Sequence, residues 1–191
     1  MAGMSAVEQQ APVWPPRVVG EWSVDDLLHS PDDGQRYEIL DGVLLVTPAP
    51  IPRHQGVLLE LAVLLRTACP PELRAFVAPL DWQPDPLTSL QPDVMVVRRD
   101  RVGEKNIAQA PTLVVEVLSP STARFDRTVR MSRYAEGGVE QFWLVDPAGP
   151  SVQVFDLVDG EYRLVAQGGP GDTVTVDGPV RVSFDPAVLG R

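Results

Sequence analysis

Two nearly continuous apolar runs place the strongest constraint on how this chain can fold. The first, TLVVEVL, covers residues 112–118, and the second, EQFWLVD, covers residues 140–146 and is closed by Pro147. Such runs are typical of strands that are covered on both faces. Between them, residues 126–136 carry a helical pattern that ends at Gly137 and Gly138. We therefore expect one right-handed strand–helix–strand crossover, with two parallel strands in a buried sheet.

The segments around this unit predict further strands and one long helix. Residues 36–46 predict a β-hairpin, because the Asp41-Gly42 pair readily takes up the positive φ that a tight turn requires. An apolar stripe predicts a helix from Pro52 to the Pro70-Pro71 pair, and strands are expected at 74–82 and 93–97. Short alternating strands after residue 150 predict a β-meander. The simplest assembly is an α/β (α+β) fold with a mixed central sheet and a helix on each side.

The chain predicts one folded domain preceded by an arm. Residues 1–20 are rich in Pro, Ala and Gln and lack periodicity, so we expect a flexible N-terminal arm. Trp14 in this arm would dock on the domain or on a second subunit, which is compatible with a homodimer. The 191 residues suit one domain, with residues 21–191 divided into a core at 36–147 and a β-rich C-terminal extension at 148–191.

Composition excludes several classes of protein. Cys69 is the only cysteine, which excludes an internal disulfide and a cysteine-based zinc site. No apolar stretch approaches the roughly 20 residues of a membrane span, so we expect no membrane association and a cytoplasmic location. The 16 basic and 26 acidic residues give a net charge of −10, which excludes a uniformly basic nucleic-acid-binding surface. Arginines clustered at 98–101 and 124–133 still allow a local basic surface.

Three acidic residues lie where folding alone does not require them. Glu116 interrupts the apolar run at 112–118, where an unpaired carboxylate costs several kcal/mol or shifts its pKa. Alternatively, Glu116 faces solvent or pairs with a core arginine. Asp93 begins an apolar strand and Glu38 lies in the hairpin, and each is unremarkable alone. If the three converge, they form an all-oxygen site that prefers Mg²⁺ or Mn²⁺, and such an ion activates water and neutralises charge on a phosphate.

Several motifs carry a resemblance to a known family. QPDV at 91–94 followed by VEVLSPST at 115–122 resembles the PD-(D/E)XK pattern of the restriction-endonuclease-like superfamily. More closely, RYEILDG at 36–42, PRH at 52–54, a D-x-x-x-R-x-x-x-Y spacing at 126–134 and GVEQFWLVDP at 138–147 resemble the Uma-two family of restriction endonucleases. The resemblance implies a restriction-endonuclease-like fold in which Asp93 and Glu116 bind the metal and Glu38 contributes a third acid. It also matches His54 to a histidine that the family carries at the start of the long helix.

The chain departs from the superfamily pattern at one position. The lysine expected two residues after the second acid is replaced by Leu118. In the Uma-two family a lysine on the following helix takes over this role, and counting from Asp126 places Arg130 at that position. An arginine can bind a phosphate and stabilise negative charge, but it cannot deprotonate water. Arg130 is therefore expected to act as an electrostatic stabiliser.

Two functions from different classes follow from these residues. The first is a hydrolase, a metal-dependent endonuclease that cleaves phosphodiester bonds in nucleic acid, most reasonably DNA, with Glu38, His54, Asp93, Glu116 and Arg130 at its site. The second is a catalytically inactive nuclease-fold module that binds or regulates. The acidic balance and Arg130 favour the second function, and the complete set of three acids favours the first. Asp93 and Glu116 must point toward each other if the first is correct.

Overall fold

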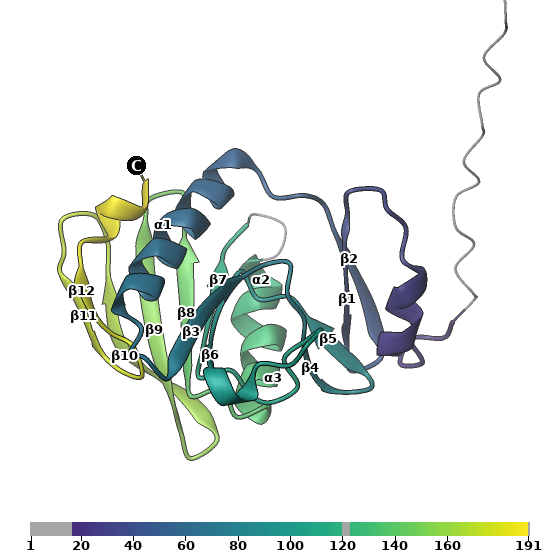
Figure 1. Cartoon of the computed structure of the whole chain (residues 1–191). Coiled ribbons are helices and arrows are strands. Elements are labelled where there is room, and N and C mark those ends of the chain that lie inside the picture. The colour runs from purple at the N-terminus through teal and green to yellow at the C-terminus, as the bar shows by residue number, and fades with distance from the viewer. Residues whose placement is uncertain (1–16, 120–122, 191) are drawn as a thin grey trace, which may run out of the picture.

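The central feature of the computed structural model, which describes residues 17–119 and 123–190, is a six-stranded sheet (Figure 1). Its strand order is β10-β9-β8-β7-β6-β3. The strands are β3 (Leu73–Val77), β6 (Val94–Arg98), β7 (Leu113–Val117), β8 (Gln141–Asp146), β9 (Ser151–Val158) and β10 (Glu161–Gly168). Only β7 and β8 pair in parallel, as the expected crossover requires, and the other neighbours are antiparallel.

A second sheet of four strands, in the order β2-β1-β5-β4, stands beside the first (Figure 1). Its strands are β1 (Arg36–Leu40), β2 (Val43–Thr47), β4 (Trp82–Asp85) and β5 (Thr88–Leu90). The predicted hairpin is confirmed, with φ of 49° at Asp41 and 76° at Gly42. The single strand predicted at 74–82 is wrong. It divides around Pro79, whose missing N–H cannot join a ladder, and β4 then continues in the second sheet.

Helices cover both faces of the six-stranded sheet. On one face lies α1 (Pro52–Ala68), together with the small sheet of β11 (Val174–Asp177) and β12 (Arg181–Phe184). On the other face lies a continuous helical segment in three parts, α2 (Ala123–Phe125), η3 (Asp126–Arg130) and α3 (Met131–Glu136). The middle part is a π-helical turn. Such turns are rare in proteins, and those that occur are often found at functional sites. The described residues also form three short 3₁₀ helices, η1 (Val24–His29), η2 (Arg99–Arg101) and η4 (Pro186–Gly190).

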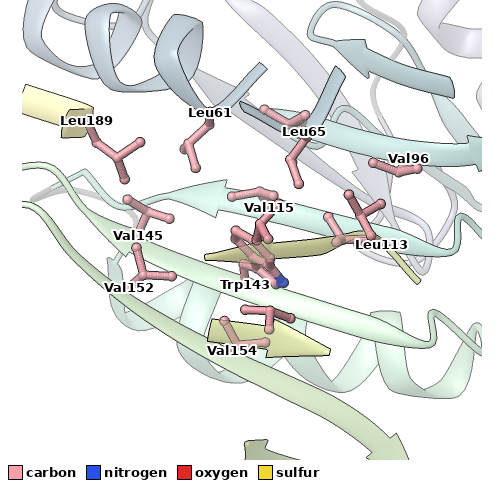
Figure 2. Packing of buried hydrophobic residues seen from close by; sticks show 14 of the residues in the cluster. Leu61, Leu65, Val96, Leu113, Val115, Trp143, Val145, Val152, Val154 and Leu189 are labelled. Carbon is pink, nitrogen blue, oxygen red and sulfur yellow. The ribbon is translucent and has the colours of Figure 1, made fainter. Parts of the chain in front are cut away.

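The hydrophobic core has two layers, one on each face of the six-stranded sheet. On the α1 face, Leu61 and Leu65 pack over Val115 and Trp143 (Figure 2). Because side chains alternate along a strand, the residues on either side of Glu116 point into this layer while Glu116 points to the other face. The apolar and aromatic side chains of that second layer include Tyr134 and Phe142, so the carboxyl group of Glu116 is placed at the edge of a core.

The two ends of the chain differ in part from expectation. The predicted β-meander is present, but β9 and β10 extend the main sheet, so the C-terminal segment is continuous with the core. Residues 1–16, with Trp14, lie outside the described residues, and the predictions made for them stay predictions. Residues 17–20 already contact the fold, because the Gly20 N–H donates to the Gly42 carbonyl at 3.0 Å. No helix of the described residues is long and apolar enough to cross a membrane.

Candidate functional site

A cavity of about 480 Å³ opens where the second sheet meets the ends of β6 and β7. Its lining includes Asp93, which immediately precedes β6, and Glu116 of the adjacent antiparallel strand β7. Val94, the first residue of β6, pairs with Val115, so Asp93 lies at the end of this ladder next to Glu116. The two acids are close enough for the charge of Asp93 to raise the pKa of Glu116. The structure therefore brings together the two acids on which the metal-site hypothesis depends.

Asp93 is held through one of its two oxygens. Its Oδ2 accepts a hydrogen bond from the Val117 N–H at 2.8 Å and lies 3.2 Å from Nε2 of His54. Among the described residues, its Oδ1 has only the longer contact of 3.4 Å to Nη1 of Arg36. Burial by itself raises the pKa of Asp93, but the hydrogen bond and charge of His54 and the nearby Arg36 outweigh burial and lower the pKa below its ordinary value. Asp93 is thus a carboxylate with one oxygen weakly engaged.

Glu116 shows the same pattern with different partners. Its Oε1 accepts hydrogen bonds from the Tyr134 hydroxyl at 2.6 Å and from Nη1 of Arg130 at 3.3 Å. Its Oε2 accepts none from any described residue. Burial is the main cause that raises the pKa of Glu116 to about 8, and the charge of Arg130 opposes this increase. Each of the two acids in the cavity therefore keeps one oxygen for an incoming ligand.

Arg130 is buried at the centre of the acidic cluster, with 2% of its side chain exposed. It forms ion pairs with Glu38 through Nη2, with Glu116 through Nη1 and with Asp126 through Nε at 3.2 Å. The π-turn of η3 carries both Asp126 and Arg130. The guanidinium of Arg130 also lies 5.9 Å from the centre of the Phe125 ring. Arg130 is thus the core arginine that pairs with Glu116, one of the alternatives considered from the sequence.

Glu38 is fully buried and belongs to the acidic cluster through its ion pair with Arg130. Besides that ion pair, its Oε1 accepts a hydrogen bond from the Gln91 N–H at 2.6 Å, and its Oε2 lies 3.4 Å from Nε of Arg36. Both of its oxygens are therefore engaged by cations or by the backbone. Across the described residues, no three His, Cys, Asp or Glu side chains form a group that could hold a metal ion. The expectation that Glu38 ligates an ion together with the other two acids stays a prediction.

His54, in the first turn of α1, supports Asp93 from the other face of β7. Its Nε2 contacts the Val117 carbonyl at 3.0 Å as well as Asp93, and both of these atoms are acceptors, so Nε2 carries the proton. Burial lowers its pKa, but the hydrogen bond and charge of Asp93 outweigh burial and raise the pKa above its ordinary value. Nδ1 is buried and has no hydrogen-bond partner among the described residues. The geometry suits His54 to orient Asp93.

The chemistry of the lining side chains fits a divalent cation that prefers oxygen. Four carboxyl groups, those of Glu38, Asp93, Glu116 and Asp126, surround the two guanidiniums of Arg36 and Arg130, so acids outnumber arginines in this cluster. Asp93 and Glu116 line the cavity and each has an oxygen that is weakly engaged or not engaged. Carboxylate oxygens are the ligands that Mg²⁺ and Mn²⁺ take in proteins.

Other basic residues lie apart from this cluster. Arg127 binds the side chain of Gln153, Arg133 pairs with Asp41 and Asp85, and Lys105 is exposed in a loop. Ser121 and Thr122, the last residues of the VEVLSPST motif, lie outside the described residues.

Arg36, Asp126 and Tyr134 were named in the sequence only as members of family motifs. Their places in the cluster, Arg36 and Tyr134 against the acids and Asp126 against Arg130, were missed. The spacing of Arg36 two residues before Glu38 on one strand puts both on the same face, and this signal could have identified Arg36.

Comparisons with known proteins agree with this architecture. The chain is similar to a protein of known crystal structure from Anabaena variabilis, described as "a putative nuclease belonging to DUF820". The TM-score is 0.70 at 22% sequence identity, over 87% of this chain and 96% of the other. No curated protein matches the chain. The model of the Uma2 family, described as "Putative restriction endonuclease", matches residues 24–186. With most of its length matched, this chain belongs to the Uma2 family.

Proposed function

We propose that this protein is a nuclease that hydrolyses phosphodiester bonds in DNA with the help of Mg²⁺ or Mn²⁺. The observation that supports this most directly is that Asp93, just before β6, and Glu116, in β7, both line the cavity at the end of the β6–β7 ladder. Membership of a family described as restriction endonucleases supports the reaction class, and proteins of that superfamily generally use divalent metals. The acidic chain is compatible with this function because the cavity needs only local attraction of the phosphate.

Asp93 and Glu116 are the residues that would hold the ion. When bound, such an ion lowers the pKa of a water molecule and neutralises negative charge that develops on the phosphate. His54 and Tyr134 each hold one oxygen of a carboxylate, so the opposite oxygen is presented in a fixed orientation. Three of these side chains come from α1, β7 and α3, and Asp93 immediately precedes β6.

The two arginines have different roles in this proposal. Arg130 is bound to three carboxylates and is almost fully buried, so it positions Glu116 and Glu38 and compensates their charge. Arg36 lines the cavity, and 27% of its side chain is exposed, so it can reach a bound phosphate. A guanidinium beside the phosphate stabilises the charge of the transition state without taking up a proton.

A second candidate function is a nuclease-fold module that binds without turnover. The observation that favours it is Arg130 itself, which stands where the family carries a lysine and whose Nε, Nη1 and Nη2 all contact carboxylates. The guanidinium of Arg130 is always protonated, so it cannot accept a proton from water as a general base would.

The test compares cleavage of DNA by the wild type, Asp93→Asn and Glu116→Gln with Mg²⁺ or Mn²⁺. Both variants should lose cleavage and should bind Mn²⁺ more weakly in calorimetry. Asp100→Asn is the matched control, because this exposed carboxylate pairs with Arg98 away from the cavity. Cleavage that survives both substitutions would refute the proposed site. Carboxylate-dependent Mn²⁺ binding without cleavage would instead favour the binding module.

A further inference from the structure

We infer that the cavity admits one unpaired nucleotide, so that the proposed nuclease acts on single-stranded DNA in preference to a duplex. This inference rests on the proposed function and specifies its substrate. Three independent features of the site support it: the depth of the acids, the apolar wall of the cavity and the absence of free cations among the described residues of its lining.

The reactive end of the cavity lies deep in the protein. Asp93 and Glu116 are only 3% and 2% exposed, so a phosphate must enter the cavity to approach them. The volume of about 480 Å³ falls within the range of about 300–1,000 Å³ found for pockets that enclose small molecules. A duplex is stiff and holds each nucleotide in a stack, and it can place one nucleotide in a pocket only by unpairing and unstacking it. A single strand avoids the cost of unpairing.

One wall of the cavity is apolar and open to solvent. The segment between β2 and α1 forms it, with Pro48, Ala49, Pro50 and Ile51 in the lining. Figure 1 shows this segment bridging from the four-stranded sheet to the start of α1. Ile51 is 59% exposed although it is a large aliphatic residue. Enzymes that act on a nucleotide taken out of the stack hold its base against apolar and aromatic side chains, so this wall suits the face of a base.

The charges of the lining also disfavour a duplex. Arg36 and His54 are the only basic side chains that the described lining contains, and both already contact Asp93. The phosphates next to the one being cleaved therefore find no free cation in the cavity, and the chain as a whole carries a net charge of −10. A duplex has one negative charge per ~1.7 Å of its axis, which is twice the charge density of one of its strands. Electrostatic repulsion is therefore weaker for the single strand.

The experiment uses one short labelled DNA strand, either alone or annealed to its complement. Fluorescence anisotropy without divalent ion measures binding, and gel analysis with Mn²⁺ measures cleavage. We expect the single strand to be bound and cleaved at least about tenfold better than the duplex, because the duplex must first unpair.

A pair of variants tests the apolar wall. Ile51→Asp should weaken single-strand binding about tenfold, because it puts a carboxylate beside the base and the phosphate. Residue 51 is the N-cap of α1, a position where aspartate is favoured, so the helix should still form in the Ile51→Asp variant. Leu59→Asp is the matched control, since Leu59 is 61% exposed on α1 and does not line the cavity.

The outcomes separate this inference from the function on which it rests. Equal or better binding and cleavage of the duplex would overturn the inference, and so would equal effects of Ile51→Asp and Leu59→Asp. If that duplex cleavage depends on Asp93, the proposed function still stands. If neither form of DNA is cleaved, the proposed nuclease fails, and Ile51-dependent binding of the single strand then still supports the cavity as a site for an unpaired nucleotide.

Discussion

Replacing Arg130 by glutamine is expected to destabilise the fold far more than loss of a typical ion pair. Its guanidinium is 2% exposed and is shared by Glu38, Glu116 and Asp126. Removal of one partner from a buried ion pair costs about 3–5 kcal/mol, because the remaining charges stay buried without compensation. At about 2–4 °C per kcal/mol for a chain of this size, the midpoint of thermal unfolding should fall by about 6–20 °C. Circular dichroism melts and urea titrations at neutral pH measure this loss.

The matched control is Arg133→Gln, three residues further along the same helical segment. The side chain of Arg133 is 13% exposed, and its partners Asp41 and Asp85 are 63% and 38% exposed. Solvent screens such pairs, so this substitution should cost only about 0–1 kcal/mol. The cost of Arg130→Gln should also shrink in acid, because the carboxylates left behind then take up protons. Equal losses of stability in the two variants, or an Arg130→Gln protein as stable as the wild type, would refute the charge-compensation argument.

Three further predictions concern the cavity and the core. Arg36→Gln should lower the turnover of DNA about 100-fold with a smaller effect on stability than Arg130→Gln, and unchanged steady-state kinetics would exclude a role at the phosphate. Burial raises the pKa of Glu116 to about 8 from its ordinary value of about 4.5, so the stability due to its protonated form is complete below about 4.5 and is lost as the pH rises toward 8. Glu116→Gln should therefore gain stability relative to the wild type over that interval, as followed by urea titrations at several pH values. Gly137→Ala should lower the free energy of unfolding by about 1–3 kcal/mol, because the new Cβ would lie within 2.6 Å of two carbons of the buried Trp82 ring. The control is Gly56→Ala in α1, where a Cβ meets no neighbour within 4 Å. This substitution should raise the free energy of unfolding by about 0.5–1 kcal/mol in the same melts.

The sequence predicted the elements of the main sheet and the position of its central acid. The runs at 112–118 and 140–146 became the parallel pair β7 and β8 because their composition leaves few alternatives to a buried strand. Glu116 was visible as a carboxylate inside one of these runs. The second sheet was only partly predicted, since the proline-rich segment at 78–92 obscures the short strands β4 and β5.

The partners of the acids were harder to predict than the acids themselves. Arg130 was expected at the site, but its simultaneous contacts with Glu38, Glu116 and Asp126 arise only when the hairpin sheet packs against the helix that follows β7. No local pattern specifies such a long-range meeting of elements. A local pattern also cannot predict that the helix contains a π-turn where Asp126 and Arg130 lie.

The charges of the site show what changes when Arg130 stands where the family resemblance implies a lysine. A lysine ammonium is a single point of charge, whereas the guanidinium of Arg130 reaches three carboxylates through three different nitrogens. Burial nevertheless raises the pKa of Glu116 to about 8, although the charge of Arg130 opposes this increase. In the proposed metal site, a proton and a divalent ion would compete for Glu116, and an ionised Asp93, with its lowered pKa, would favour the ion. Arg130 would then maintain the acidic cluster, while Asp93 and Glu116 would hold the ion.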